Sequence, residues 1–134
     1  MLFEKLLTAA EDGDVKDVKI CLENKVDIDY HDEFGQTALM LAAGGGHLEI
    51  CRILIDTGCK IDITGVYGVT ALMKAALNGH LEVCRLLIDR GCKIDITDTG
   101  FGWTALIWAA RGGRLEVCRL LIDTGCKINI TNNE

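Results

Sequence analysis

Apolar and polar positions recur along this chain in blocks of nearly constant length. Three blocks align when each is written from a shared glycine: GQTALMLAAGGGHLEICRILIDTGCKIDIT from Gly35, GVTALMKAALNGHLEVCRLLIDRGCKIDIT from Gly68, and GWTALIWAARGGRLEVCRLLIDTGCKINIT from Gly102. The glycines are 33 and 34 residues apart, and a weaker copy from Leu6 to Asp29 precedes them at an offset of 33. A period of this length is typical of proteins built from stacked repeats.

Each block predicts two helices followed by an extended loop. The first helix is short, because a threonine hydroxyl can cap its start and a glycine stands near its end. The capping threonines are Thr37, Thr70 and Thr104, and the glycines are Gly46, Gly79 and Gly113. The second helix runs from Leu48 to Asp56 in the first full block, where its apolar positions form a broad face for burial.

A glycine also follows the second helix, at a place that suits the left-handed conformation of a helix end. These glycines are Gly58, Gly91 and Gly125. The next residues, Lys-Ile-Asp-Ile-Thr in the first two full blocks, alternate in polarity as an extended segment does before a turn. The repeating unit is therefore helix, turn, helix and extended loop.

The shared pattern G-x-T-A-L-x-x-A-A-x-x-G-H-L-E-[IV]-C-R-x-L-I-D-x-G-C-K-I-D resembles the ankyrin repeat, and the resemblance covers essentially the whole chain. It implies an all-α solenoid of four stacked helix-turn-helix units with β-hairpin-like loops. It also implies a single domain, residues 1–134, with units of about 1–34, 35–67, 68–101 and 102–134. The first unit resembles an N-terminal cap, because it is richer in charge. Members of the family mostly bind proteins, through the loop tips and the concave face formed by the first helices.

Three departures from the family pattern affect the loops and one helix end. Alanine replaces the family's proline after each threonine, at Ala38, Ala71 and Ala105. The family's next histidine is replaced by Met40, Met73 and Ile107, which predicts that a hydrogen bond that usually ties neighbouring loops is missing. Lys25 stands where the other units have the glycine that ends the second helix. We expect the same architecture, with loops that are held less firmly.

The copies differ from one another mainly at five equivalent positions: Gln36/Val69/Trp103, Leu41/Lys74/Trp108, Gly44/Leu77/Arg111, Gly45/Asn78/Gly112 and Thr57/Arg90/Thr124. Most of these differences change size or charge, which a close-packed interior tolerates badly, so the positions are expected at the surface. In an ankyrin-like unit they correspond to the loop tip and the exposed side of the first helix, the face that the family uses for binding. The alternative is that solvent-facing positions simply drift. Exposed positions of the second helix nevertheless stay fixed, as in Glu49/Glu82/Glu116 and Arg52/Arg85/Arg119.

Aromatic residues provide a second signal. Phe34, Tyr67 and Phe101 occupy one loop-tip position in successive units, and Trp103 lies beside the last of them. Such rings are frequent anchors of binding interfaces, but here they could also pack on neighbouring loops and hold the tips together. Trp103 and Trp108 are stronger binding candidates, because no other copy needs a tryptophan at these positions in order to fold.

Charged residues divide the predicted binding face. Lys74, Arg90 and Arg111 are expected to add positive charge near Trp108, whereas the opposite end is acidic, with Asp29, Asp32 and Glu33. This division predicts a protein or peptide partner that carries acidic and apolar groups near Trp108. The predicted partner-binding residues are Phe34, Gln36, Leu41, Tyr67, Val69, Lys74, Leu77, Asn78, Phe101, Trp103, Trp108 and Arg111.

Composition and charge argue against several other functions. A net charge of −6 does not suit a nucleic-acid partner, since binding phosphates needs clustered Lys and Arg. No run approaches the roughly 18 apolar residues of a membrane span. The first residues carry acidic side chains, which does not suit a signal peptide. Seven cysteines without such a signal indicate free thiols in a reducing compartment, so a cytoplasmic or otherwise intracellular location is expected.

No arrangement of residues predicts catalysis, a metal site or a cofactor, so the chain is not expected to be an enzyme. Six cysteines recur at two positions where the family usually has valine and alanine, and we expect them to be small buried hydrophobes. Equivalent cysteines one repeat apart are separated by roughly 8–10 Å, more than the about 7 Å between Cα atoms that a disulfide allows. A redox or metal function is the less favoured alternative. His47 and His80 occupy the family's Gly-His position, and Arg114 replaces them in the last unit, which does not suit a catalytic base.

The last unit does not resemble a cap. Its second helix carries the same apolar residues as the inner units, whereas terminal repeats normally need a polar outer face. The chain is therefore expected either to be a fragment of a longer array or to form a homo-oligomer through this end. The favoured function is a protein-interaction module. The alternative is a structural or regulatory segment of a longer repeat protein that self-associates through its apolar C-terminal end.

Overall fold

Eight α-helices and one short 3₁₀ turn form the regular structure of residues 2–128. The structure is a computed structural model that describes residues 2–128. In this range the elements are α1 (Leu2–Asp12), α2 (Val15–Glu23), α3 (Ala38–Gly45), α4 (Leu48–Thr57), η1 (Val66–Gly68), α5 (Ala71–Leu77), α6 (Leu81–Asp89), α7 (Ala105–Arg111) and α8 (Leu115–Thr124), and there is no β-strand. None of these helices has the length and apolar character needed to cross a membrane.

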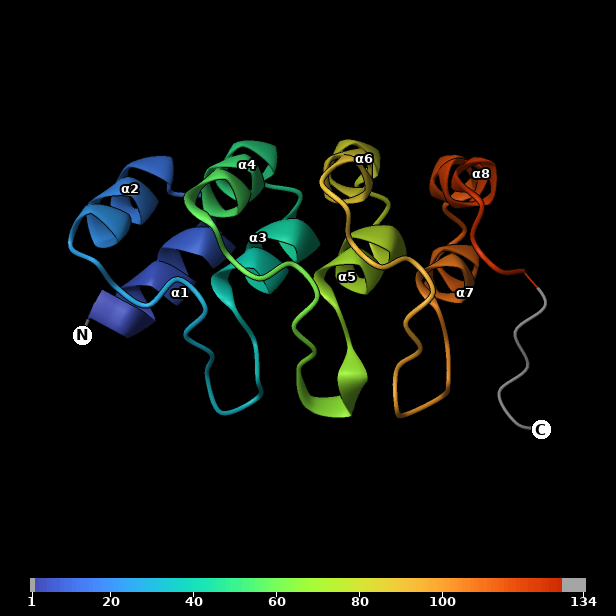
Figure 1. Ribbon diagram of the computed structural model, residues 1–134, viewed down its shortest axis with the longest axis horizontal. Coiled ribbons are helices and arrows are strands. Elements are labelled where there is room, and N and C mark those ends of the chain that lie inside the picture. The colour runs from blue at the N-terminus through green and yellow to red at the C-terminus, as the bar shows by residue number, and fades with distance from the viewer. Residues whose placement is uncertain (1, 129–134) are drawn as a thin grey trace.

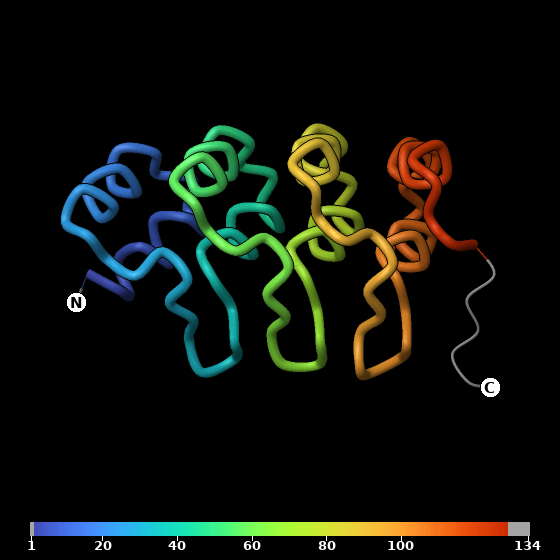
Figure 2. Tube along the Cα trace, in the orientation of Figure 1, coloured from blue at the N-terminus to red at the C-terminus, as the bar shows by residue number. Residues whose placement is uncertain are grey.

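The helices form two rows (Figure 1). An inner row contains α1, α3, α5 and α7 packed side by side, and an outer row contains α2, α4, α6 and α8. Each inner helix is joined to its outer helix by a short turn, and the loops that follow α2, α4 and α6 project beyond the inner row, as the tube in Figure 2 shows. One backbone hydrogen bond closes each of these three loops like a hairpin: Asp32 to Gln36, Gly65 to Val69, and Asp98 to Trp103. The predicted all-α repeat solenoid is confirmed.

The predicted helix caps are confirmed as well. The hydroxyl oxygens of Thr37, Thr70 and Thr104 accept hydrogen bonds from the backbone N–H three residues further on, at 3.3, 3.2 and 3.4 Å. A glycine with positive φ lies at or just after the end of each helix from α3 onward, where a side chain would be strained. These φ angles are 76° at Gly46, 107° at Gly58, 76° at Gly79, 88° at Gly91, 71° at Gly113 and 99° at Gly125. Lys25, which follows α2 in place of such a glycine, also has a positive φ, of 60°.

Small aliphatic side chains fill the core between the two rows. Seven alanines of the inner helices are fully buried: Ala10, Ala38, Ala42, Ala43, Ala75, Ala76 and Ala109. Leucines of the outer helices, Leu54, Leu87 and Leu121, are also fully buried, and no aromatic side chain is among the buried residues of the described range. Because the distance between packed helices depends on the side chains at the contact, the alanines let the inner helices approach closely.

Three sets of hydrogen bonds tie each unit to the next. The carboxylates of Asp29, Asp62 and Asp95 accept from the backbone N–H of Lys60, Lys93 and Lys127, at 3.0, 3.0 and 2.8 Å. At the turns between helices, His47 Nε2, His80 Nε2 and Arg114 Nε lie 3.0, 3.1 and 3.0 Å from the backbone carbonyl oxygens of Glu11, Gly44 and Leu77. At the loop tips, the N–H of Val66 donates to the Phe34 carbonyl at 3.0 Å, and the N–H of Thr99 donates to the Tyr67 carbonyl at 2.7 Å.

These bonds hold the loops despite the departures from the family pattern. Met40 and Met73 are buried, and their side chains cannot donate the hydrogen bond that the family's histidine makes. The backbone and aspartate bonds nevertheless link each loop to its neighbour, so the first three loops form a continuous row. His47, His80 and Arg114 share one structural role, as donors to the carbonyl of the preceding unit. Arginine can therefore replace histidine in the last unit.

Candidate binding surface

Three neighbouring cavities lie between the loops and the inner helices. The first cavity, of about 500 Å³, is lined by Glu4, Leu7, Thr8, Glu11, Tyr30, Asp32, Glu33, Phe34, Gln36 and Leu41. The middle cavity, of about 270 Å³, is lined by Phe34, Gln36, Met40, Gly65, Val66, Tyr67, Val69 and Lys74. The last cavity, of about 300 Å³, is lined by Tyr67, Val69, Asp98, Gly100, Phe101 and Trp108. Pockets that hold whole small molecules occupy roughly 300–1,000 Å³. The middle and last cavities lie at or just below the lower end of this range, so each has the size to accept a single side chain of a partner.

The three cavities are consecutive because they share walls. Phe34 and Gln36 line both the first and the middle cavity, and Tyr67 and Val69 line both the middle and the last. Each cavity also contains the residue at one equivalent position of an inner helix: Leu41 of α3, Lys74 of α5 and Trp108 of α7. We refer to the row of three cavities as the inter-loop groove. Most of the predicted partner-binding residues line it, namely Phe34, Gln36, Leu41, Tyr67, Val69, Lys74, Phe101 and Trp108.

Charge changes sign along the inter-loop groove. Four carboxylates line the first cavity, those of Glu4, Glu11, Asp32 and Glu33. The middle cavity has Lys74 as its charged residue. The last cavity has Asp98, which is buried and accepts three hydrogen bonds, and Arg111 lies close by, next to Trp103. Neither Lys74 nor Arg111 forms an ion pair with another residue of the described range. Their charges are therefore available to a partner.

Aromatic rings of the third loop and of α7 form one cluster. Phe101 stacks on Trp103 with ring centroids 4.4 Å apart, and Trp103 meets Trp108 edge-on at 4.8 Å. The guanidinium of Arg111 lies 5.4 Å from the centroid of the Trp103 ring, within the range of a cation–π interaction. The rings therefore support one another in a fixed arrangement before any partner binds.

Asp98 positions this cluster, although it does not stand out when the copies are compared. Asp98 is 4% exposed, and its carboxylate accepts hydrogen bonds from the backbone N–H groups of Phe101 and Gly102 at 2.7 and 3.0 Å. It also accepts one from Trp108 Nε1 at 2.8 Å. Trp108 thus has a structural contact that the other copies lack. The sequence signal for the role of Asp98 is that the first loop also has an aspartate shortly before its aromatic tip, Asp32. Asp32 likewise accepts hydrogen bonds from two backbone N–H groups of its own loop.

The aromatic rings at the tips of the first two loops, Phe34 and Tyr67, are exposed to solvent. Phe34 is 58% exposed and Tyr67 is 70% exposed, and neither ring contacts another aromatic ring of the described range. Tyr67 also has a φ of 71°, a left-handed conformation that is uncommon for a residue with a side chain. The loops are linked through their backbones, so these two rings are not needed to hold the tips together.

Models of protein families match nearly the whole chain. A model of three ankyrin repeats matches residues 6–98, and a model of one ankyrin repeat matches residues 101–133. The chain belongs to the ankyrin-repeat family. Ankyrin repeats are generally protein–protein interaction modules and are typically not enzymes. Among curated proteins, the comparison finds no match.

Four of the predicted binding residues of this ankyrin-repeat chain do not line the three cavities. Trp103 and Arg111 lie in the aromatic cluster beside the last cavity, whereas Leu77 and Asn78 lie apart from the groove. Leu77 is the last residue of α5 and Asn78 follows it. The side-chain amide of Asn78 donates to the Gly44 carbonyl at 2.8 Å, and the Leu77 carbonyl accepts from Arg114 at 3.0 Å. Both residues therefore belong to contacts between units, at the end of the inner helix that is away from the cavities.

Two charged residues are placed differently from the prediction. Arg90 follows α6 in the outer row and forms an ion pair with Asp56 of the preceding unit, so it does not add positive charge near Trp108. Asp29 accepts a hydrogen bond from the Lys60 backbone and does not line the first cavity. The acidic end of the groove is formed instead by α1 and the first loop, through the carboxylates named above.

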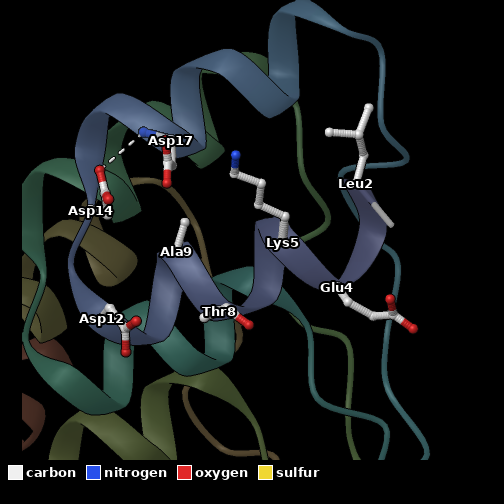
Figure 3. Close-up of a pocket in the computed structure, with 8 residues that line it drawn as sticks. All are labelled: Leu2, Glu4, Lys5, Thr8, Ala9, Asp12, Asp14 and Asp17. Atoms are coloured by element: carbon white, nitrogen blue, oxygen red, sulfur yellow. Dashed lines mark hydrogen bonds between the residues drawn. The ribbon is translucent and has the colours of Figure 1, made fainter.

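A further hollow, of about 670 Å³, lies at the N-terminal end of the array (Figure 3). It is lined by Leu2, Glu4, Lys5, Thr8, Ala9, Asp12, Asp14 and Asp17. Asp14 caps α2 by accepting a hydrogen bond from the Asp17 N–H at 3.1 Å. The later units hold Ile50, Val83 and Val117 at the position of Asp17, each at most 2% exposed. A carboxylate there gives this unit the polar outer face of a terminal repeat, which favours its interpretation as a cap.

The cysteines of the described range are free thiols. Burial raises the pKa of four of them to about 12: Cys51, Cys59, Cys84 and Cys92. Burial also raises the pKa of Cys21 and Cys126. Since the thiolate is the reactive form, these thiols are poor nucleophiles at neutral pH. Within residues 2–128, no three His, Cys, Asp or Glu side chains gather where they could hold a metal ion.

Proposed function

We propose that this chain is an interaction module that binds a protein or peptide in the inter-loop groove, through the loop tips and the concave face of the inner helices. The supporting observation is that two of the five positions at which the copies differ, those of Gln36/Val69 and Leu41/Lys74/Trp108, line consecutive cavities with shared walls. Drift at exposed positions gives no reason for such continuity.

We also propose that residues 1–134 act as one domain of four units with the boundaries given above, because the groove is built from all four inner helices and the loops between them.

The side chains of the groove are of the kinds that contribute most to binding. Trp, Tyr and Arg are the residues most enriched among those whose removal weakens an interface strongly. Tyr67 is exposed at the boundary of two cavities, and beside the last cavity Trp103 contacts both the Phe101 ring and the Arg111 guanidinium. Rings that are already held in place lose little conformational freedom on binding, which favours affinity.

Capture experiments with matched variants test this proposal. The immobilised protein is incubated with a cell lysate, and the captured proteins are quantified for the wild type, Trp103→Ala, Lys74→Glu and the control Arg52→Ala. Arg52 is exposed on α4 in the outer row and has the same charge as Lys74. We expect a specific partner to be lost at least tenfold with the two groove variants and retained with the control. Circular dichroism must show the same helix content for all four proteins.

The outcome that contradicts the proposal is equally specific. A verified partner that binds Trp103→Ala and Lys74→Glu with wild-type affinity does not use the groove. Loss of the partner with Arg52→Ala, while the groove variants still bind, would place the interface on the outer row.

The exposed C-terminal end supports a second candidate function, that of a structural or regulatory segment which self-associates. Leu115 is 76% exposed and Ile122 is 46% exposed. The equivalent residues of the two preceding units are half-buried: Leu48, Leu81, Ile55 and Ile88. An exposed apolar patch of this kind suits a further repeat or a second copy of the chain.

Light scattering across a dilution series tests this second candidate. If the end self-associates, the mass of the wild type rises with concentration, and Leu115→Lys abolishes the rise. The control is Ile20→Lys, which alters an exposed isoleucine of α2 in the first unit. A wild type that stays monomeric over the whole series removes the candidate.

A further inference from the structure

We infer that the inter-loop groove selects an extended peptide in the polyproline II conformation, with apolar side chains three residues apart in the middle and last cavities and a basic side chain in the first. The inference rests on the proposed function, and it adds the conformation and the side-chain pattern of the bound segment. Four features of the groove support it: the spacing of the cavities, the rings between them, the strained backbone of Tyr67, and the change in the sign of the charge.

The spacing of the cavities sets the spacing of the anchors. Neighbouring cavities belong to neighbouring units, whose inner helices pack directly on each other, and packed helices lie about 8–10 Å apart. In polyproline II every third side chain points the same way, about 9 Å further on. In a β-strand the side chains on one face are about 7 Å apart, so they fall out of register with the cavities.

The rings between the cavities disfavour a helical ligand. Phe34 separates the first cavity from the middle one, and Tyr67 separates the middle one from the last. Both rings are more than half exposed, so they stand out from the floor of the groove. An α-helix with its side chains is about 10–12 Å wide, and it would rest on these rings instead of filling the cavities. An extended segment can pass its backbone over the rings and lower single side chains between them.

Tyr67 combines exposure with an unfavourable backbone conformation. A φ of 71° is disfavoured for a residue with a Cβ, and glycine would adopt it without strain. Phe34 and Phe101, at the equivalent tips, do not have a positive φ. Strained residues are concentrated at binding sites, where their position serves the function. Tyr67 and Gly68 both have a positive φ in the tight turn closed by the hydrogen bond from the Gly65 N–H to the Val69 carbonyl, so this turn holds the exposed ring as the wall between two cavities.

The charges determine the order of the side chains. The carboxylates of the first cavity attract a Lys or Arg side chain of the ligand. Lys74 in the middle cavity and Arg111 next to Trp103 attract an Asp or Glu close to the apolar side chains, and the Asp98 carboxylate of the last cavity is already occupied by three hydrogen bonds. Along the groove the ligand therefore presents a basic residue, an apolar residue three positions on, and a second apolar residue after three more, with an acidic residue close to the apolar pair. Charge fixes this order whichever way the backbone of the ligand runs.

Selection from a random peptide library tests the inference. Displayed peptides of twelve residues are selected on the immobilised full chain, and the enriched sequences are synthesised with a fluorescent label and titrated. We expect enriched peptides to carry apolar residues three apart and a basic residue three beyond. Moving the second apolar residue by one position should weaken binding at least tenfold. Lys74→Glu should weaken binding, and exchanging the acidic residue of the peptide for lysine should restore it.

Tyr67 provides the control for folding. Tyr67→Gly removes the wall but relieves the backbone strain, so it should weaken the selected peptides at least tenfold while the thermal midpoint is not lowered. Tyr67→Phe keeps the ring and should keep binding. Loss of affinity without loss of stability cannot be attributed to unfolding.

The possible outcomes separate this inference from the proposed function. Peptides whose anchors are two, four or seven residues apart, and which still lose binding with Trp103→Ala, overturn the inference and leave the proposed function in place. Peptides that bind Tyr67→Gly and Trp103→Ala as tightly as the wild type overturn both. A library without any binder to the groove overturns the inference, and the capture experiment then decides the proposed function alone.

Discussion

Replacement of Asp98 by alanine tests how the aromatic end of the groove is held. The carboxylate is almost fully buried and accepts three hydrogen bonds, two from the backbone of the third loop and one from the Trp108 indole. A hydrogen bond to a charged group contributes about 1.5–3 kcal/mol, and part of this is recovered where the freed donors reach water. We therefore expect Asp98→Ala to lower the free energy of unfolding by about 3 kcal/mol.

Asp32 provides the matched control. It accepts hydrogen bonds from the backbone N–H groups of Phe34 and Gln36, at 2.9 and 3.0 Å, but it is only half-buried and has no indole partner. Its two donors are also more accessible to water once the carboxylate is removed. We expect Asp32→Ala to cost about 1–1.5 kcal/mol. The difference between the two variants reports the bond to Trp108 and the packing that depends on it.

The two tryptophans make the measurement specific to one unit. Trp103 and Trp108 both lie in the last unit, so their fluorescence reports that unit, whereas far-UV circular dichroism reports the whole array. Each repeat contacts only its neighbours, so a local loss can shift one transition before the other. In urea denaturation of Asp98→Ala we expect the fluorescence transition to move further than the dichroism transition. Equal costs for Asp98→Ala and Asp32→Ala would refute the reasoning.

Three further predictions concern helix ends and thiols. Lys25→Gly should raise the free energy of unfolding by about 0.5–1 kcal/mol, because it relieves a left-handed conformation at an exposed residue. A urea midpoint no higher than that of the wild type contradicts this. Thr70→Val should cost about 1 kcal/mol by removing the cap of α5, and Thr70→Ser much less, so equal midpoints for the two variants would exclude the cap as the cause. The thiols whose pKa burial raises to about 12 should keep their stabilising effect below the ordinary thiol pKa of about 8.5 and lose it as the pH rises toward 12. A urea midpoint that stays constant from pH 7 to pH 11 is incompatible with this.

The fold could be predicted from the sequence because its determinants are local. A threonine before an apolar run and a glycine after it act within a few residues, so the caps at Thr37 and Gly58 could be deduced without knowledge of the stack. The second helix of the first full block ends one residue beyond its expected end, at Thr57, because the helix continues up to its left-handed glycine. The repeat period then determined the stack, since units of equal length place equivalent residues side by side.

The candidate surface could be predicted only in part. Comparing the copies shows which positions of the repeat vary, but not which other residues of the chain each side chain contacts. The comparison selected exposed positions of both rows, and Arg90 belongs to the outer row, where it pairs with Asp56. Asn78 is exposed too, but its amide is used between units. Asp98 was missed, although Asp32 precedes the first loop tip in a similar way, because its three donors are brought together by the shape of a loop that is one residue longer than the others.

The hydrogen bonds between units explain which side chains of the groove can differ from copy to copy and which are also needed for the structure. The helices are held in the stack by aspartates, by His47, His80 and Arg114, and by buried alanines, none of which lines the middle or the last cavity. The bonds between loop tips do involve residues of the groove, but they join backbone atoms and do not depend on the side chains there. Lys74 makes none of these hydrogen bonds, so a loss of binding in Lys74→Glu reports the surface itself. Trp103 stacks on Phe101 and meets Trp108, so Trp103→Ala also removes support from the aromatic cluster. Trp108 is different, because its indole also completes the bonds of Asp98. A loss of binding in Trp108→Ala combines a missing contact with a loosened loop, so it can support a binding site only when Trp103→Ala and Lys74→Glu lose the same partner.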